Sequence, residues 1–390
     1  MRILHVLPLL SARAGGPQLF ATGAALSMRG LGVESTLFAT DLAHVPSAFK
    51  ARSVLLEELP QGIEELETRL FPTRPPRRLA YAPALGAALR RAVPEADVVH
   101  IHSLWLYPQF AAYRAARQGH RPYVVSPHGA LDPFLRQRGR MRKALTTALW
   151  QRPMLEGAAT IHVLTEEEAE LIADIAPQVP RTIVPSGLDI SAFTRLPDPR
   201  AFRQAHVGGH TGPIVLFLGR ITFKKGIDVL IRAFALARPR LRDAKLVIVG
   251  SDDEALQPGL EALARELDVS AEVVFTGGVY REKRLAALAA ADAWALSSHT
   301  ENFGIAVVEA LAAGVPTIVS PAVNIAKDIA AAGAGVVADL TPQAFADAIV
   351  SVLADAEAAG RLAAAARSFA GQYDWSAIAP RLLELYRGVT

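Results

Sequence analysis

Short, continuous apolar runs alternate with longer alanine- and leucine-rich segments along almost all of this 390-residue chain. Parallel strands covered by helices on both faces have this pattern, because neither face of such a strand meets water. The alternation therefore predicts an α/β fold. The expected strands are residues 2–8, 33–40, 97–103, 122–127, 160–164 and 181–185 in the first half, and 214–219, 245–250, 272–276, 293–298, 316–320 and 335–338 in the second.

A stretch rich in proline, glycine and polar residues interrupts the alternation near the middle of the chain, within residues 189–213. We therefore expect two doubly wound domains, 1–190 and 213–375, joined by a linker at 191–212. A last helix within residues 376–390 is expected to pack back on the first domain. Because open α/β sheets bind ligands at the carboxyl ends of their strands, two such domains facing each other would form one cleft.

The composition narrows the class of protein. There are no cysteines, which excludes disulfides and thiolate metal sites, and no apolar run reaches the roughly 18 residues that a membrane-spanning helix needs. No export signal is convincing, so we expect a cytoplasmic protein. We expect no nucleic-acid partner.

Positive charge is concentrated in one part of the chain, although the net charge is only +3. Between Phe71 and Leu155 there are 14 lysines and arginines against three acids. This excess is typical of a solvated basic surface, and it is equally consistent with an anionic partner or a peripheral contact with an anionic membrane. The stretch 134–155 is the densest part, with Arg136, Arg138, Arg140, Arg142 and Lys143.

Basic residues follow the first expected strand of the second domain, in "FLGRITFKKGIDVL". The strand delivers Arg220 to its carboxyl end, and Lys224, Lys225 and Gly226 precede a helix. A guanidinium and an ammonium beside a helix N-terminus suit a diphosphate, which must be held and neutralised. Solvated loop cations are the alternative interpretation.

Two glutamates flank a loop and helix start in "SSHTENFGIAVVEALAAG". Glu301 follows a strand, and Phe303, Gly304 and Ile305 open a helix whose N–H groups form its positive end. Glu309 lies about one and a half turns into that helix, where its carboxylate could accept the hydroxyls of a ribose. The first domain contributes a weaker signal, a Gly15–Gly16 loop after its first strand. There is no G-x-G-x-x-G motif, which argues against a dinucleotide-dependent dehydrogenase.

Taken together, "GRITFKKG" and "TENFGIAVVEA" resemble the donor-site signature of the family 4 retaining glycosyltransferases, which have the GT-B fold of two Rossmann-like domains facing across a cleft. The resemblance extends over nearly the whole chain, through "HVLPLLSARAGGPQ", "VVHIHS", "SPHGALDP", "PSGLD" and "YDW". It implies a metal-independent hexosyltransferase that needs no cofactor. The substrates implied are a UDP- or GDP-linked sugar and a glycan or lipid-linked acceptor, as in the synthesis of cell-surface polysaccharide.

The resemblance also implies residue roles. Arg220 and Lys225 would bind the donor diphosphate, Glu309 the ribose, and Glu301 the donor sugar. The amides of Phe303, Gly304 and Ile305 would belong to the donor site. His128 would lie near the donor sugar, and Gly15 and Gly16 would face the phosphates or the acceptor. The catalytic set would then be Glu301, Arg220, Lys225 and His128.

Other interpretations stay open at this point. A sugar-nucleotide epimerase or a phosphorylase could use the same architecture, and a sensor could bind sugar nucleotides without turnover. His100, His102 and His128 could form a three-histidine metal site, although cleft or backbone contacts are the expected role of such residues. Asp252 and Asp253 do not have the spacing of a metal-binding D-x-D motif, which favours a solvated loop.

Overall fold

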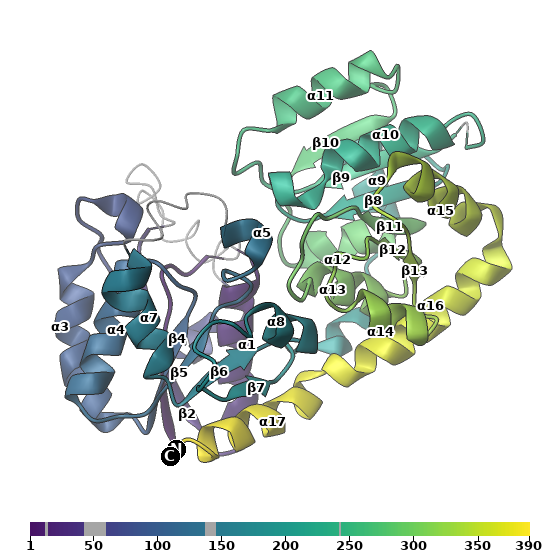
Figure 1. The fold of residues 1–390 in the computed structure, drawn as a ribbon. Coiled ribbons are helices and arrows are strands. Elements are labelled where there is room, and N and C mark those ends of the chain that lie inside the picture. The colour runs from purple at the N-terminus through teal and green to yellow at the C-terminus, as the bar shows by residue number, and fades with distance from the viewer. Residues whose placement is uncertain (12–14, 43–59, 137–145, 242) are drawn as a thin grey trace. The chain divides into compact units, whose positions relative to one another are not determined.

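The computed structural model describes residues 1–11, 15–42, 60–136, 146–241 and 243–390. The chain divides into two compact units (Figure 1). The first unit combines Met1–Gly187 with Trp375–Thr390, and the second is Leu188–Asp374. Each unit contains one all-parallel sheet with helices on both of its faces, which is the arrangement that the alternating sequence pattern predicts.

The sheet of the first unit has seven strands in the order β3-β2-β1-β4-β5-β6-β7. The strands are β1 (Arg2–Val6), β2 (Glu34–Thr40), β3 (Glu67–Phe71), β4 (Val98–His102), β5 (Tyr123–Ser126), β6 (Thr160–Val163) and β7 (Arg181–Ile183). The helices are α1 (Gly16–Arg29), α3 (Pro83–Ala92), α4 (Tyr107–Gln118), α5 (Pro133–Arg136), α7 (Arg152–Glu156), α8 (Glu166–Leu171) and α17 (Trp375–Arg387), with 3-10 turns η3 (Ile63–Glu65), η4 (Arg77–Leu79) and η5 (Val93–Glu95), and a π-helical turn η6 (Thr147–Gln151).

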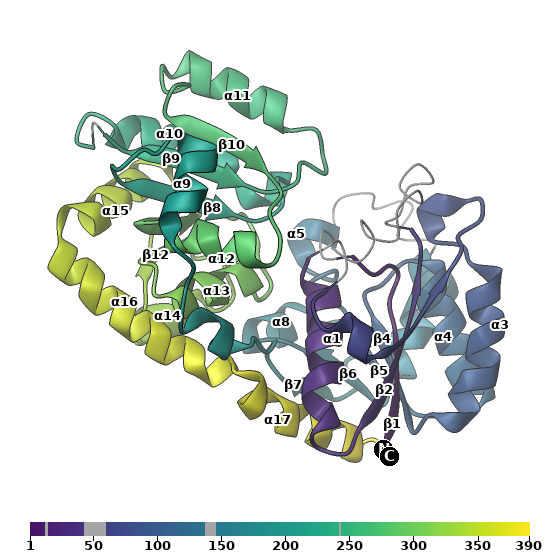
Figure 2. The same cartoon turned by 180° about the vertical axis from the view of Figure 1, so that it is seen from behind.

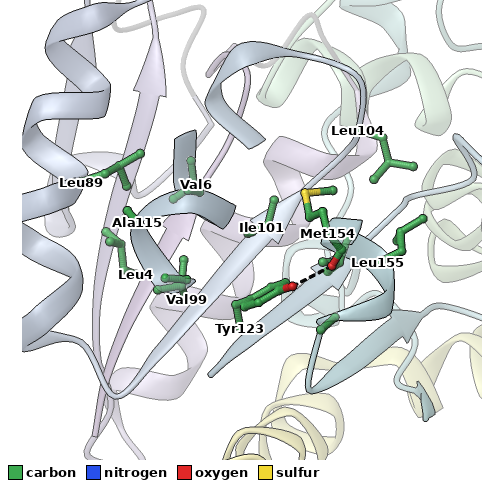
Figure 3. Close-up of a cluster of buried hydrophobic side chains, with 14 of the residues drawn as sticks. Leu4, Val6, Leu89, Val99, Ile101, Leu104, Ala115, Tyr123, Met154 and Leu155 are labelled. Carbon is green, nitrogen blue, oxygen red and sulfur yellow. Dashed lines mark hydrogen bonds between the residues drawn. The ribbon is translucent and has the colours of Figure 1, made fainter. Parts of the chain in front are cut away.

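Alternate residues of the central strands face opposite sides of this sheet. Leu4, Val6, Val99 and Ile101 pack with α3, α4 and α7 in one apolar core (Figure 3). The hydroxyl of Tyr123 donates a hydrogen bond to the carbonyl oxygen of Met154 at 2.8 Å and ties β5 to α7 within this core. The residues between them in sequence point to the other face, which α1 and α17 cover.

The C-terminal helix α17 belongs to the first unit and packs against α1. The indole of Trp375 occupies the space that a Cβ would need at both Gly23 and Gly187, so these two glycines allow its close approach. Arg381 also donates a hydrogen bond to the carbonyl oxygen of Ile183 at 3.1 Å. The N- and C-termini lie side by side in Figures 1 and 2.

The sheet of the second unit has six strands in the order β10-β9-β8-β11-β12-β13. They are β8 (Ile214–Leu218), β9 (Lys245–Val249), β10 (Val273–Gly277), β11 (Ala293–Leu296), β12 (Thr317–Val319) and β13 (Val336–Val337). The helices are α9 (Pro199–Val207), α10 (Ile227–Ala237), α11 (Gln257–Glu266), α12 (Glu282–Ala289), α13 (Ile305–Ala313), α14 (Ala326–Ala331), α15 (Pro342–Ala354) and α16 (Ala356–Ala370), with 3-10 turns η7 (Ile190–Phe193), η8 (Phe223–Lys225) and η9 (Gly371–Tyr373).

The structure forms a strand at each of the twelve expected places, with ends that differ by up to two residues. It adds β3, which the sequence pattern missed. The segment "ETRLF" is at the edge of the sheet and has no continuous apolar run, because one side of an edge strand remains exposed to water.

The predicted linker 191–212 is also more ordered than its composition suggests. It contains α9, whose Phe202 is buried and which packs against α12 of the second unit. Asp198 caps this helix by accepting a hydrogen bond from the backbone N–H of Arg200 at 2.9 Å, and Gly208 ends it in the left-handed region. The amphipathic pattern of "PRAFRQAHV" is the signal that identifies it.

Candidate active site

The loop after β8 lies against the end of β11. Gly226 has a φ of 59°, and a Cβ at this position would collide with the carbonyl oxygen of Ser297. The hydroxyl of Ser297 donates a hydrogen bond to the carbonyl oxygen of Gly226 at 2.7 Å, and the backbone N–H of His299 donates to that of Lys224 at 2.7 Å. Glycine at position 226 is therefore required both by the backbone conformation and by the close approach of the two loops.

This contact brings the predicted cations next to the first predicted glutamate. Lys225 forms a hydrogen-bonded ion pair with Glu301, and the Nζ of Lys224 lies 3.7 Å from the same carboxylate oxygen. The three side chains are largely buried, with exposed fractions of 21% for Lys224, 13% for Lys225 and 12% for Glu301. The site therefore has two positive charges and one negative charge in a poorly solvated position.

The cluster keeps Glu301 ionised. Burial raises the pKa of Glu301, but the ammonium groups of Lys224 and Lys225 act in the opposite direction and bring it down to about 2. Burial lowers the pKa of Lys225, against the opposing effect of Glu301. This arrangement leaves a net positive charge that is suited to a phosphate group.

Arg220 lies at the margin of this cluster. Its Nη1 is 3.3 Å from Oδ2 of Asp253, and both side chains are about 40% exposed. It still acts on Lys225 and Glu301 electrostatically, although it is the weakest of the causes that shift their pKa values. Neighbouring Asp252 accepts hydrogen bonds from the backbone N–H groups of Leu256 and Gln257 at the start of α11, so it has a structural role.

The segment after Glu301 forms the start of α13. Phe303 is buried and packs edge-on against Tyr373, with ring centroids 5.2 Å apart. Gly304 is the N-cap of α13 with a φ of 74°, and Ile305 is the first helical residue. No acidic residue lies in the first turn, so the positive end of the helix is not neutralised by its own side chains.

Glu309 lies farther along α13 and is almost fully buried, with 6% of its side chain exposed. It forms an ion pair with Arg284 of α12, which the sequence interpretation missed. Burial raises the pKa of Glu309 to about 7, and the guanidinium of Arg284 opposes that effect. No motif singles out Arg284 in "YREKRLAALAAAD", because its importance comes only from the packing of α12 on α13.

In the first unit, a hydrogen-bonded chain crosses the sheet face under α17. The Nε2–H of His162 donates to the carbonyl oxygen of Val184 at 2.8 Å, so its neutral ring accepts at Nδ1 from the hydroxyl of Ser126 at 2.6 Å. Ser126 in turn accepts from Nε2–H of His100 at 2.6 Å, and Nδ1 of His100 accepts from the hydroxyl of Tyr386 at 2.7 Å. The carbonyl oxygen of Val184 thus fixes the tautomers of His162 and His100 in this series of hydrogen bonds.

A second chain contains the predicted site residue His128. Nε2 of His128 lies 3.0 Å from Nδ1 of His102, and Nε2 of His102 lies 3.0 Å from Nδ1 of His5. His5 and His102 are fully buried, whereas His128, with a φ of 51°, is partly exposed at the end of β5. Burial lowers the pKa of His5 and of His128 to about 3 and that of His162 to about 4, so these imidazoles are neutral.

The metal alternative considered for His100, His102 and His128 does not match the observed cluster. Among the described residues, the group of three imidazoles whose ring nitrogens all lie within 4.8 Å of one another is His5, His100 and His102. Both nitrogens of His100 already have hydrogen-bond partners. His5, His100 and His102 are part of a buried hydrogen-bonded network.

Two of the sequence predictions are only partly covered. Gly15, with a φ of 94°, caps α1, and Gly16 is its first residue, but residues 12–14 of the same loop lie outside the described residues. Of the five basic residues highlighted in 134–155, Arg138, Arg140, Arg142 and Lys143 also lie outside the described residues.

Within the described parts of the chain, no helix combines the length and the apolar composition that crossing a bilayer requires.

Family models and known proteins similar to this chain show its family. The glycosyl transferases group 1 model matches residues 199–369, and the glycosyl transferase 4-like domain model matches residues 15–187. The chain is 30% identical to a D-inositol 3-phosphate glycosyltransferase of Mycolicibacterium smegmatis, over 98% of this chain and 89% of that protein. The chain belongs to the family 4 glycosyltransferases.

Other relatives and solved structures extend the comparison. A GDP-mannose-dependent alpha-(1-6)-phosphatidylinositol monomannoside mannosyltransferase of M. smegmatis is 30% identical over 78% of this chain and 81% of its own length. The crystal structure of Anabaena HepE in complex with UDP and glucose superposes with a TM-score of 0.78 at 20% identity, covering 99% of both chains. The GT-B fold and glycosyltransferase activity that the sequence predicts are thereby confirmed.

Proposed function

We propose that this glycosyltransferase moves a hexose from a UDP- or GDP-linked donor to a hydroxyl group of a glycan or lipid-linked acceptor, with retention of anomeric configuration and without a metal ion. The observation that carries the proposal is the buried cluster of Lys224, Lys225 and Glu301 beside the start of α13. Two ammonium groups and a helix N-terminus are suited to a diphosphate, and a carboxylate held ionised among them is suited to a sugar.

In the proposed reaction, the bond between the anomeric carbon and the diphosphate oxygen breaks, while the acceptor oxygen forms a new bond to that carbon from the same face. The acceptor proton passes to an oxygen of the departing phosphate. Positive charge develops on the sugar ring and negative charge on the leaving group. Lys225, with Lys224 and Arg220 beside it, stabilises the negative charge, and the carboxylate of Glu301 orients the sugar and moderates its positive charge.

The other donor contacts follow from positions on α13. The amides of Phe303, Gly304 and Ile305 complement the phosphates from the positive end of the helix. Glu309 accepts hydrogen bonds from the ribose hydroxyls. The roles near the donor sugar for His128, and near the phosphates or the acceptor for the Gly15–Gly16 loop, rest on the family resemblance.

The relatives suggest the classes of substrate. One of them is named for GDP-mannose, one solved structure contains UDP and glucose, and two relatives are named for inositol-containing substrates. We infer an anionic or lipid-linked acceptor because the first domain is rich in basic residues, with 14 against three acids between Phe71 and Leu155.

The same excess of basic residues supports a place at the cytoplasmic face of the membrane. A role in the synthesis of cell-surface polysaccharide rests on the family resemblance. Flotation with vesicles tests this part alone. Binding should rise with the content of anionic lipid and fall with salt, because the Debye length shrinks to about 3 Å at 1 M. Absence of binding at low salt would remove the membrane contact and leave the transfer reaction untouched.

A thermal-shift panel of sugar nucleotides, followed by an assay of nucleoside diphosphate release with and without acceptors, tests the reaction. A donor at 100 times its dissociation constant should stabilise the protein by about 2.7 kcal/mol. Release that depends on an acceptor supports transfer. Isomerised donor would instead indicate an epimerase, phosphate-dependent cleavage a phosphorylase, and binding without turnover a sensor.

Two further measurements test the finer claims. Activity should survive a chelator, because Lys224, Lys225 and Arg220 supply positive charge at the proposed phosphate site. The anomeric configuration of the product, read by NMR at early times, should match that of the donor. An inverted product would exclude the same-face mechanism.

A further inference from the structure

The carboxylate of Glu309 has one oxygen committed to a neighbouring helix. Its Oε2 is buried and paired with an Nη atom of Arg284, whose side chain is 25% exposed. The pair links α13, the helix that starts at the proposed phosphate site, to α12. Only 6% of the Glu309 side chain remains exposed, so bulk water contributes little to its solvation.

Arg284 is the group that stabilises the charged form of Glu309. Burial favours the neutral acid, and the guanidinium acts against it. The elements that pack most extensively on α13 among the described residues are α12, α16, β12 and η7. The charged residues they carry are Glu282, Lys283 and Arg284 on α12, and Glu357, Arg361 and Arg367 on α16.

Among these residues, Arg284 is the one that acts on the carboxylate of Glu309. Glu357 and Arg361 pair with each other at 2.6 Å, and Arg367 lies beside Gly314, at the C-terminal end of α13. The titration of Glu309 thus depends on a single partner from another helix.

We propose that Arg284 is a positioning residue for nucleotide recognition, which holds Glu309 ionised and fixes its carboxylate so that Oε1 accepts hydrogen bonds from the ribose of the donor. This inference rests on the proposed function, which places the ribose at Glu309. A carboxylate accepts two hydroxyl protons well, whereas the protonated acid offers a weaker acceptor and one donor of its own. Recognition of ribose then requires the charge of Arg284, even where Arg284 does not contact the nucleotide.

The test measures dissociation constants by calorimetry for UDP, GDP and their 2′-deoxy counterparts, at several values between about pH 6 and about pH 9. Wild-type protein should bind the ribonucleotide about tenfold more tightly than the 2′-deoxy counterpart, which is about the contribution of one hydrogen bond to a charged group. It should lose part of that preference below about pH 7, where Glu309 becomes protonated. Arg284→Gln should abolish the preference at neutral pH and recover it at the alkaline end, where Glu309 ionises without help. Arg284→Lys, which keeps the charge, should lie between the two.

The matched control is Arg238→Gln, which removes another ion pair of the same unit, to Glu272 at 2.6 Å, and should leave the preference unchanged. Glu309→Gln separates the possible failures. If it abolishes the preference while Arg284→Gln keeps the wild-type value at every pH, Arg284 has no such role and the proposed ribose site stands. If wild-type protein binds neither UDP nor GDP, the proposed function fails and this inference fails with it.

Folding of the variants is checked before binding. If Arg284→Gln does not fold, Arg284→Lys is the test of the inference. The lysine side chain has no guanidinium group, so this variant should show a measurably smaller ribose preference than wild type at neutral pH. A wild-type preference in the lysine variant, unchanged from acid to alkaline pH, would overturn the inference.

Discussion

Lys225 and Glu301 form an ion pair at the carboxyl ends of two neighbouring strands, β8 and β11, and their side chains are only 13% and 12% exposed. Seventy-six positions separate them in sequence. Burial alone would favour the neutral form of both groups; Lys224 and Lys225 keep Glu301 charged, and Glu301 opposes the effect of burial on Lys225. Replacing Glu301 therefore leaves two buried ammonium groups without their carboxylate, whereas replacing Lys225 leaves Glu301 with Lys224 as its cation.

Loss of the cations should slow transfer. Lys225→Ala should reduce kcat by roughly 100-fold, because the variant loses a cation that stabilises the negative charge developing in the transition state. Arg220→Ala should also reduce kcat. The matched control is Lys245→Ala, because the ammonium of Lys245 only reaches the carbonyl oxygen of Ala271 in the same unit. Turnover close to wild type in both Lys225→Ala and Arg220→Ala would contradict the proposed phosphate site.

The two glutamates should separate binding from transfer. Glu309→Gln should weaken the binding of the free nucleoside diphosphate, because the neutral amide is a poorer acceptor for the ribose hydroxyls. Glu301→Gln should leave that binding largely intact and reduce transfer. Calorimetry for binding and product release for transfer check the division, and the opposite pattern would refute it.

The sequence predicts the sheets of this protein well because parallel strands buried on both faces have a local signature. Most of the twelve expected strands are continuous apolar runs, which can be identified without knowledge of their neighbours in the sheet. Strand β3 lacked that signature because it lies at the edge of the sheet, and α9 was hidden in a segment whose composition is typical of a linker. Both errors arise where burial depends on packing and not on composition.

Some residues of the candidate site could likewise be predicted from the sequence, and others could not. Lys225 and Glu301 could be predicted because each follows a strand, and the carboxyl ends of parallel strands meet at one edge. Arg284 could not, since only the packing of α12 on α13 brings it to Glu309. The same holds for His5, which the alternation places on the α1 and α17 face but whose partner His102 comes from another strand.

The glycine between the two loops should be sensitive to substitution. Gly226→Ala should destabilise the protein by about 1–3 kcal/mol, because alanine disfavours a φ of 59° and its Cβ would collide with the carbonyl oxygen of Ser297. It should also reduce transfer, because relief of this collision would move the loop and displace Lys224 and Lys225. Chemical denaturation measures the first effect and product release the second.

The control for this substitution is Gly360→Ala in the interior of α16, where a new Cβ meets no atom within 4 Å. Alanine is the better helix former there, so we expect a gain of about 0.5–1 kcal/mol and unchanged turnover. Equal stability of the Gly226→Ala protein and wild type would show that the loop after β8 adjusts without cost.

The buried histidines should make the first unit sensitive to acid. In the unfolded chain a histidine titrates near its ordinary pKa of 6.5, whereas in the folded protein the pKa of His5 is about 3 and that of His162 about 4. The folded state binds the proton less well. Stability is therefore complete above about pH 6.5 and falls as the pH drops toward the folded values, by about 1.4 kcal/mol per pH unit for each such histidine.

Denaturation followed by tryptophan fluorescence checks this expectation, since Trp105, Trp150 and Trp375 belong to the first unit and only Trp294 to the second. His5→Gln removes one proton-binding group, so the decline of the unfolding free energy between about pH 6 and about pH 4 should become shallower by about 1.4 kcal/mol per pH unit. His120→Asn, at an exposed position with a φ of 50° that asparagine tolerates, should leave the slope as in wild type. An unchanged slope in His5→Gln would mean that this imidazole takes up its proton in the folded protein as readily as in the unfolded chain, and the neutral hydrogen-bonded core would have to be abandoned.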